Sequence, residues 1–105
     1  MFASLRLLTA CPVKLWQMLE EFYFIYILES LKDGKRYTGY TSNLPLRLEH
    51  HNSGKVDSTK NRRPFKLIYF EACLNQKDAI KREKYLKTFH GKKFLGNRLK
   101  SYLTG

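Results

Sequence analysis

Residues 22–41 read FYFIYILESLKDGKRYTGYT, and this stretch decides the fold. From residue 22 to residue 28 it is apolar on both alternating sets, which is typical of a strand covered on both faces. Asp33-Gly34 is a strong reverse-turn signal, and residues 36–41 resume a strand-like pattern. The stretch therefore predicts an antiparallel hairpin whose first strand lies at the centre of a sheet.

A helix should follow the hairpin. Residues 41–43, Thr-Ser-Asn, offer capping side chains, and Pro45 suits the first turn because its missing N–H is not needed there. Leu44 and Leu48 are four apart and form the buried face of this helix. Residues 52–54, Asn-Ser-Gly, are typical of its end.

The second half of the chain predicts one more strand and two more helices. The strand is expected over residues 66–71. Asn75 opens a capping box for a helix that runs to about Thr88, and apolar residues at helical spacing over 94–103, beyond Gly91, predict a last amphipathic helix. The sum is an α+β fold, a small three-stranded antiparallel sheet flanked by helices.

Composition narrows the class of partner. The 105 residues are enough for one small domain, and 20 Lys plus Arg against 9 Asp plus Glu give a net charge of +11. Such a charge favours a polyanionic partner. A membrane surface is the competing polyanion, but the chain lacks a run of eighteen apolar residues, and its cations alternate with turns instead of lining one long helix. Nucleic acid is the favoured partner and no membrane is expected.

The cysteine content indicates the compartment. Cys11 and Cys73 are far apart and lack Cys-x-x-Cys spacing, so neither a disulfide framework nor a zinc finger is supported. The pattern indicates a reducing, cytoplasmic location, and nothing in the sequence indicates an organic cofactor.

Residues 1–21 are expected to be an extension that precedes the domain at 22–105. Residues 1–8 are mostly apolar, which hints at a secretory leader, but the apolar run is short and no Ala-x-Ala site follows. The favoured interpretation is a dispensable extension, with Met18 as an alternative start. A short helix over 13–21 that packs on the domain is the third interpretation.

Glu83 is the acidic residue whose position calls for an explanation. At about 100° per residue, Ala79, Ile80 and Leu86 define the buried arc of their helix, and Glu83 falls in the middle of that arc. A carboxylate that faces a core must be paired or must bind a cation. The sequence leaves two interpretations open, a salt bridge to an arginine such as Arg47 and a metal site.

Arg47 and His51 are four residues apart, so they share one helix face. An arginine there can neutralise a scissile phosphate through a bidentate contact, although a solvated charge is the common alternative. His50 points about 100° away from His51, and His51 is the histidine in phase with Arg47.

Taken in order, these residues resemble the GIY-YIG nuclease family. The family has paired tripeptides on adjacent strands, then an arginine, often a histidine, and later a glutamate on a helix. Here the tripeptides are residues 24–26, Phe-Ile-Tyr, and 37–39, Tyr-Thr-Gly. Both tyrosines and the closing glycine are present, and phenylalanine replaces the leading glycine. Arg47, His51 and Glu83 then follow, and the resemblance runs from about residue 22 to residue 102.

The resemblance implies a role for each residue in phosphodiester hydrolysis. Glu83 binds the metal, and a single carboxylate suits Mg²⁺ or Mn²⁺, which keep most of their water. Arg47 stabilises the phosphate, Tyr26 accepts a proton from the attacking water, Tyr37 orients water or phosphate, and His51 relays protons. Because a phenol has a reference pKa near 10, Tyr26 serves only if its phenolate is favoured or if it passes the proton on.

Further residues are expected to contact the nucleic acid. Gly39 indicates close backbone approach to the substrate or to a neighbouring helix. The resemblance places Asn97 near the metal or a phosphate. Cations on the loop after the first helix and near the chain end either track phosphates or form a solubilising surface. They are Lys55, Lys60, Arg62 and Arg63 on the loop, and Lys92, Lys93, Arg98 and Lys100 near the end.

The resulting prediction is a metal-dependent endonuclease that cuts DNA and recognises its structure, not a long sequence. A protein partner that supplies specificity is compatible with this prediction. The alternative is a catalytically inactive nucleic-acid-binding module, or an adaptor in a DNA repair or restriction complex.

Overall fold

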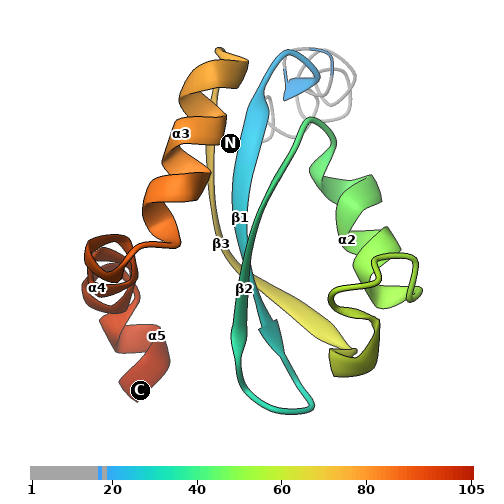
Figure 1. Ribbon diagram of the computed structural model, residues 1–105, viewed down its shortest axis with the longest axis vertical. Helices are drawn as coiled ribbons and strands as arrows, with labels where there is room; N and C mark the ends of the chain where they lie inside the picture. Colours follow the sequence, from blue (N-terminus) through green and yellow to red (C-terminus); the bar gives the residue numbers. More distant parts are fainter. Residues whose placement is uncertain (1–16, 18) are drawn as a thin grey trace, which may run out of the picture.

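The computed structural model describes residue 17 and residues 19–105 (Figure 1). The elements run in the order β1 (Tyr23–Ser30), β2 (Arg36–Thr41), α2 (Leu44–Asn52), a 3₁₀ turn (Lys60–Arg62), β3 (Phe65–Cys73), α3 (Gln76–Leu86), α4 (Phe89–Arg98) and α5 (Lys100–Thr104). The predicted α+β class and three-stranded antiparallel sheet are confirmed. Most of the expected N-terminal extension lies outside the described residues, as does Cys11, whereas Cys73 is a free thiol.

The sheet has the strand order β2-β1-β3, so β1 is central, as the hairpin stretch predicts. In the antiparallel register, Tyr26 lies opposite Gly39 on β2 and opposite Phe70 on β3. Gly34 in the hairpin turn has φ of 72°, a conformation that glycine adopts without strain. Since β2 is an edge strand, one side of the hairpin stays open.

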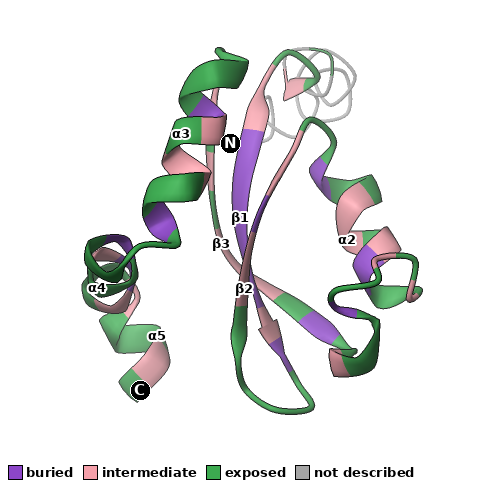
Figure 2. Cartoon of the chain, viewed as in Figure 1, coloured by how far each residue is buried: buried purple, intermediate pink, exposed green. Residues whose placement is uncertain are grey.

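Helices cover both faces of the sheet, with α2 on one side and α3, α4 and α5 on the other (Figure 1). Each side has its own apolar cluster. Ile25, Ile27, Ala79, Leu86 and Leu95 form the first, and Phe24, Tyr26 and Leu44 form the second. Figure 2 shows β1 as a buried ribbon between these two layers. Alternate residues of β1 therefore feed opposite cores.

The predicted capping residues at the starts of α2 and α3 are confirmed. The Asn43 side chain accepts a hydrogen bond from the Leu46 N–H, with Pro45 in the first turn. The Asn75 side chain accepts from the N–H groups of Lys77 and Asp78. These caps satisfy backbone donors that a helix leaves unpaired.

The predicted last helix over residues 94–103 is wrong in its bounds, because α4 begins at Phe89 and α5 follows as a separate short helix. The Thr88 hydroxyl caps α4 by accepting from the Gly91 N–H. Gly91 lies inside α4, and a Cβ there would be 2.0 Å from the Tyr85 carbonyl oxygen. Its glycine thus serves the close approach of α3 and α4, not a helix end. In the described part of the chain, no helix has the length and apolar content to span a bilayer.

Candidate active site

Tyr26 and Gly39 lie opposite each other in the hairpin and fit closely together. A Cβ on Gly39 would lie 2.4 Å from both Cζ and Oη of Tyr26. The Tyr26 phenol therefore lies over the glycine, with 1% of the residue exposed. The expectation that Gly39 admits substrate or a neighbouring helix needs correction, since the tyrosine ring itself fills that space.

The Tyr26 hydroxyl lies in a chain of buried polar groups. Its oxygen is 2.8 Å from His51 Nε2, and His51 Nδ1 is 2.8 Å from Thr59 Oγ1. Arg47 Nε donates to the same Tyr26 oxygen at 3.3 Å, and Thr59 donates to the Val56 carbonyl at 3.4 Å. Every hydrogen finds an acceptor when donation runs from Arg47 to Tyr26, His51, Thr59 and the carbonyl. His51 Nε2 is then a lone-pair acceptor facing the phenol.

Tyr37 completes this group from β2. Its ring meets that of Tyr26 edge-on at 6.3 Å between centroids and that of His51 at 5.0 Å. It is half-buried, so it lies nearer to solvent than Tyr26. The structure therefore brings four of the predicted site residues together on the α2 side of the sheet: Tyr26, Tyr37, Arg47 and His51.

The electrostatics of this cluster keep its central groups neutral. Burial lowers the pKa of His51 to about 4, and the charges of Arg47 and His50 add to the effect. Burial likewise raises the pKa of Tyr26, which outweighs the hydrogen bond from Arg47. Tyr26 is thus a protonated phenol at neutral pH. Of its two expected modes of action, only passing a proton on agrees with this environment.

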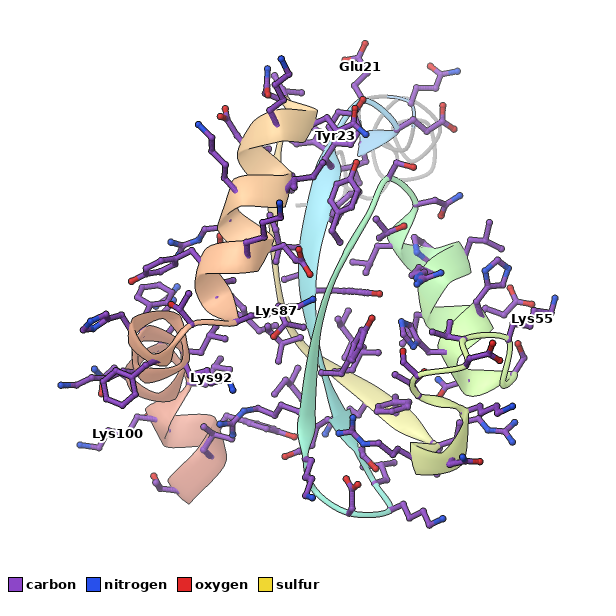
Figure 3. The ribbon with its side chains drawn as sticks, viewed as in Figure 1. Glu21, Tyr23, Lys55, Lys87, Lys92 and Lys100 are labelled. Atoms are coloured by element: carbon purple, nitrogen blue, oxygen red, sulfur yellow. The ribbon has the colours of Figure 1, made fainter. Side chains whose placement is uncertain are left out.

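Glu83 lies on α3, across the sheet from the helix that carries Arg47. Its side chain is 14% exposed and forms an ion pair with Lys87, so a salt bridge is present, as one of the two interpretations expected, but its partner is a lysine and not an arginine such as Arg47. Figure 3 shows Lys87 reaching from the end of α3 toward the strands. The Glu83 charge nevertheless acts on Tyr26, where it contributes to the raised pKa. The acid and the guanidinium therefore come from opposite layers and influence the same phenol.

Glu83 is the carboxylate of this region that suits a cation. Glu71 is held by Arg82 at 2.8 and 3.0 Å and by the Tyr69 hydroxyl at 2.8 Å. No group of three or more His, Cys, Asp or Glu side chains comes together in residues 19–105. Lys87 occupies one Glu83 oxygen, Oε2, and the other remains for a ligand. One carboxylate fits a hard ion that keeps its water, such as Mg²⁺ or Mn²⁺.

Some cations of the loop between α2 and β3 are bound to other residues, and others are exposed to solvent. Arg62 binds Asp33 at 3.2 Å and lies over the Phe65 ring at 5.7 Å, so it has structural partners, and its role as a phosphate contact stays a prediction. Arg63 donates to the Lys60 carbonyl at 2.7 Å but stays exposed, as do the side chains of Lys55 and Lys60. Asn97 is exposed on α4, outside the tyrosine cluster.

Phe24, which replaces the leading glycine of the first tripeptide, is a packing residue. It is 7% exposed, clusters with Leu44, and meets the Phe70 ring at 6.1 Å. These contacts hold α2 and β3 against β1. The substitution therefore leaves the hydroxyl cluster of Tyr26 intact.

Two residues of the site were absent from the sequence prediction. Lys87 follows Glu83 by four positions on one helix face, which is a readable signal for an ion pair. Thr59 lies in the loop between α2 and β3, eight residues after His51. Its contact depends on how that loop folds, and no local pattern marks it.

Comparisons with known proteins identify the family of the chain. The family model described as the GIY-YIG catalytic domain matches residues 22–102. A UPF0213 protein of Staphylococcus haemolyticus is 43% identical over 68 residues, 64% of this chain and 82% of the relative. A UPF0213 protein of Clostridium perfringens is 45% identical over 65 residues, 61% of this chain and 69% of the relative. The solution NMR structure of a UPF0213 protein from Bacillus halodurans is 35% identical, covers 72% of this chain and 83% of its own, and has a TM-score of 0.47. The chain therefore belongs to the GIY-YIG nuclease family.

Proposed function

We propose that this protein is a divalent-metal-dependent endonuclease that hydrolyses phosphodiester bonds in DNA. The observation that carries the proposal is the hydrogen-bonded chain of Arg47, Tyr26 and His51, on whose central phenol the charge of Glu83 also acts. A guanidinium, a proton path and a carboxylate are the groups that metal-assisted hydrolysis requires.

The proton path runs through the buried phenol. As the attacking water gives a proton to Tyr26 Oη, the Tyr26 hydrogen moves along its 2.8 Å bond to His51 Nε2. Tyr26 is 1% exposed, so this path requires that substrate binding bring the attacking water to the phenol. Because the pKa of His51 is lowered to about 4, the imidazolium returns the proton through Tyr26 Oη, which passes it to the leaving oxygen.

Arg47 and Glu83, which come from opposite layers of the fold, stabilise the negative charge of the phosphate. Arg47 donates to the tyrosine through Nε, so its terminal N–H groups remain to bind two phosphate oxygens. Glu83 is the residue that would hold a divalent ion. A Mg²⁺ or Mn²⁺ ion held there would supply Lewis-acid stabilisation of the leaving oxygen.

DNA with branches, flaps or nicks is the proposed substrate class. The exposed cations of the domain contact phosphates, which carry no direct sequence information. Selectivity on such a surface follows the shape of the nucleic acid, and a protein partner would sharpen it.

The proposal is tested with supercoiled, linear and branched DNA in Mg²⁺ or Mn²⁺. Wild type should cut at least one of these substrates, and Glu83→Gln should lower the rate by about a hundredfold or more. Glu49→Gln is the matched control, because Glu49 is an exposed glutamate on α2, and it should retain the wild-type rate. Cleavage that survives Glu83→Gln would rule out this site.

A binding module is the second candidate function. The pairing of Glu83 with Lys87 and the 1% exposure of Tyr26 favour it, because both reduce the access that catalysis needs. Tight, salt-dependent DNA binding without cleavage of any of the three substrates would support this candidate over the nuclease.

A further inference from the structure

A basic pocket opens between the β1–β2 hairpin turn and α4, on the face of the sheet opposite the tyrosine cluster. Its volume is about 330 Å³. Lys35, Arg36 and Lys92 line it, and the buried residues Ile27 and Leu95 form its floor. We infer that this pocket holds a backbone phosphate of the bound DNA strand at a position other than the scissile one. The inference rests on the proposed nucleic-acid substrate and adds a path for the strand.

The three cations of the pocket are available to a ligand. Within residues 19–105 they form no salt bridge, unlike the four cations that do: Lys60, Arg62, Arg82 and Lys87. Glu29 lies opposite Arg36 in the strand register and is the nearest acid along β1. Its carboxylate accepts the Tyr102 hydroxyl at 2.7 Å. The pocket therefore concentrates positive charge with no acid in its lining.

The pocket is formed by separate elements and continues along β2, which favours binding of a polymeric polyanion over a free anion. Two cations come from the hairpin and one from α4, and Figure 3 shows Lys92 on the side of α4 that faces the strands. Thr38 adds a half-buried hydroxyl next to Gly39 on the edge strand β2. The pocket therefore continues along the same strand that places Gly39 against Tyr26.

The pocket and the tyrosine cluster are joined by β2. Arg36 precedes Gly39 by three residues, roughly 10 Å at about 3.3 Å per residue. Arg36 lines the pocket, and Tyr37, the next residue, belongs to the cluster. A DNA strand that crosses β2 with its scissile phosphate at Arg47 would therefore bring another of its phosphates to the pocket.

Affinity measurements across salt concentrations test the inference without cleavage. Fluorescence anisotropy with a labelled branched DNA in EDTA would compare wild type with a pocket variant, Lys35→Gln, Arg36→Gln and Lys92→Gln combined. The plot of log affinity against log salt should become shallower by about 1, the change expected for one lost phosphate contact, and affinity at low salt should fall about tenfold.

A matched variant separates local contact from net charge. Lys77→Gln, Lys81→Gln and Lys84→Gln combined removes the same charge from the exposed face of α3. It should retain the wild-type salt slope. Equal slopes in the two triple variants, or an unchanged slope in the pocket variant, would overturn the inference. Competition by millimolar inorganic phosphate that matches competition by DNA would also overturn it, because the pocket would then be a free-anion site.

Neutral phosphate substitution locates the contact. Methylphosphonates placed one at a time in the DNA should weaken wild-type binding at a position other than the scissile phosphate. The same substitution should leave the pocket variant unaffected. A methylphosphonate effect that persists in the pocket variant would place the contact elsewhere. These measurements do not require the protein to cleave DNA. If the expected binding pattern is found but no cleavage occurs, only the nuclease proposal is contradicted.

Discussion

At the scale of single residues, the Tyr26 ring requires a glycine at position 39. Gly39→Ala places a Cβ 2.4 Å from the phenol, so the ring must move away from His51. We expect the free energy of unfolding to fall by about 1–3 kcal/mol and cleavage to be lost. Gly96→Ala is the control, because a Cβ there meets open space within α4 and should stabilise the protein by roughly 0.5–1 kcal/mol. Urea unfolding measures both, and a Gly39→Ala variant as stable as wild type would refute the fit.

His51 should make stability depend on pH. Its pKa falls from 6.5 to about 4 in the folded protein. Between these two pH values the unfolded chain binds a proton at this histidine and the folded protein does not. The contribution is complete above pH 6.5 and is lost as pH falls through 4, with an upper limit of about 3 kcal/mol. Urea unfolding between pH 7 and 4 should show a weaker pH dependence in His51→Gln than in wild type, whereas His50→Gln should keep most of the dependence, because burial is the main cause of the His51 shift. Identical profiles for His51→Gln and wild type would contradict the buried neutral state.

The residue scale also shows what local patterns can and cannot predict. Spacing placed Arg47 and His51 on one helix face, and both contact the Tyr26 hydroxyl. The raised pKa of that phenol was not predictable, because it follows from burial, which depends on packing by distant segments. Thr59 was missed for the same reason, since its contact with His51 comes from the fold of a loop.

At the scale of elements, α3 places Glu83 and Lys87 one turn apart. A glutamate four residues before a lysine is the favourable orientation for such a pair. The Lys87 ammonium must leave one Glu83 oxygen before that oxygen can bind a cation. Lys87→Met should therefore lower the Mg²⁺ concentration needed for half-maximal cleavage several-fold. A titration of cleavage rate against Mg²⁺ measures this, with Lys84→Met as the exposed control. An increased Mg²⁺ requirement in Lys87→Met would show that Lys87 supports the ion.

The elements differ in how far the sequence predicts them. The hairpin was predictable because its turn and its apolar strands are local signals, and the register follows from the turn. The bounds of α4 were not predictable, because Gly91 has the local pattern of a helix end and a tertiary role in helix packing. A glycine selected for close approach of two helices cannot be told from a terminator in one sequence.

At the scale of the whole molecule, the site is assembled across the sheet. Arg47 comes with the layer of α2 and Glu83 with the layer of α3, and β1 carries Tyr26 between them. The sequence predicts each helix but not how its polar side chains lie relative to those of the other layer. Because β2 is an edge strand, side chains from both faces of the sheet can meet around it.

This arrangement predicts a non-additive double variant. If Arg47 and Glu83 act on one phosphate, either substitution alone removes most of the stabilisation of the transition state, and the second has little left to remove. We expect Arg47→Gln and Glu83→Gln each to lower the single-turnover rate about a hundredfold, and the combined variant to be only a few-fold slower than the worse single one. Matching urea midpoints would show that all three variants are folded. Rate losses that multiply to about ten-thousandfold would mean that the two layers act independently, because groups on one phosphate share a single transition state.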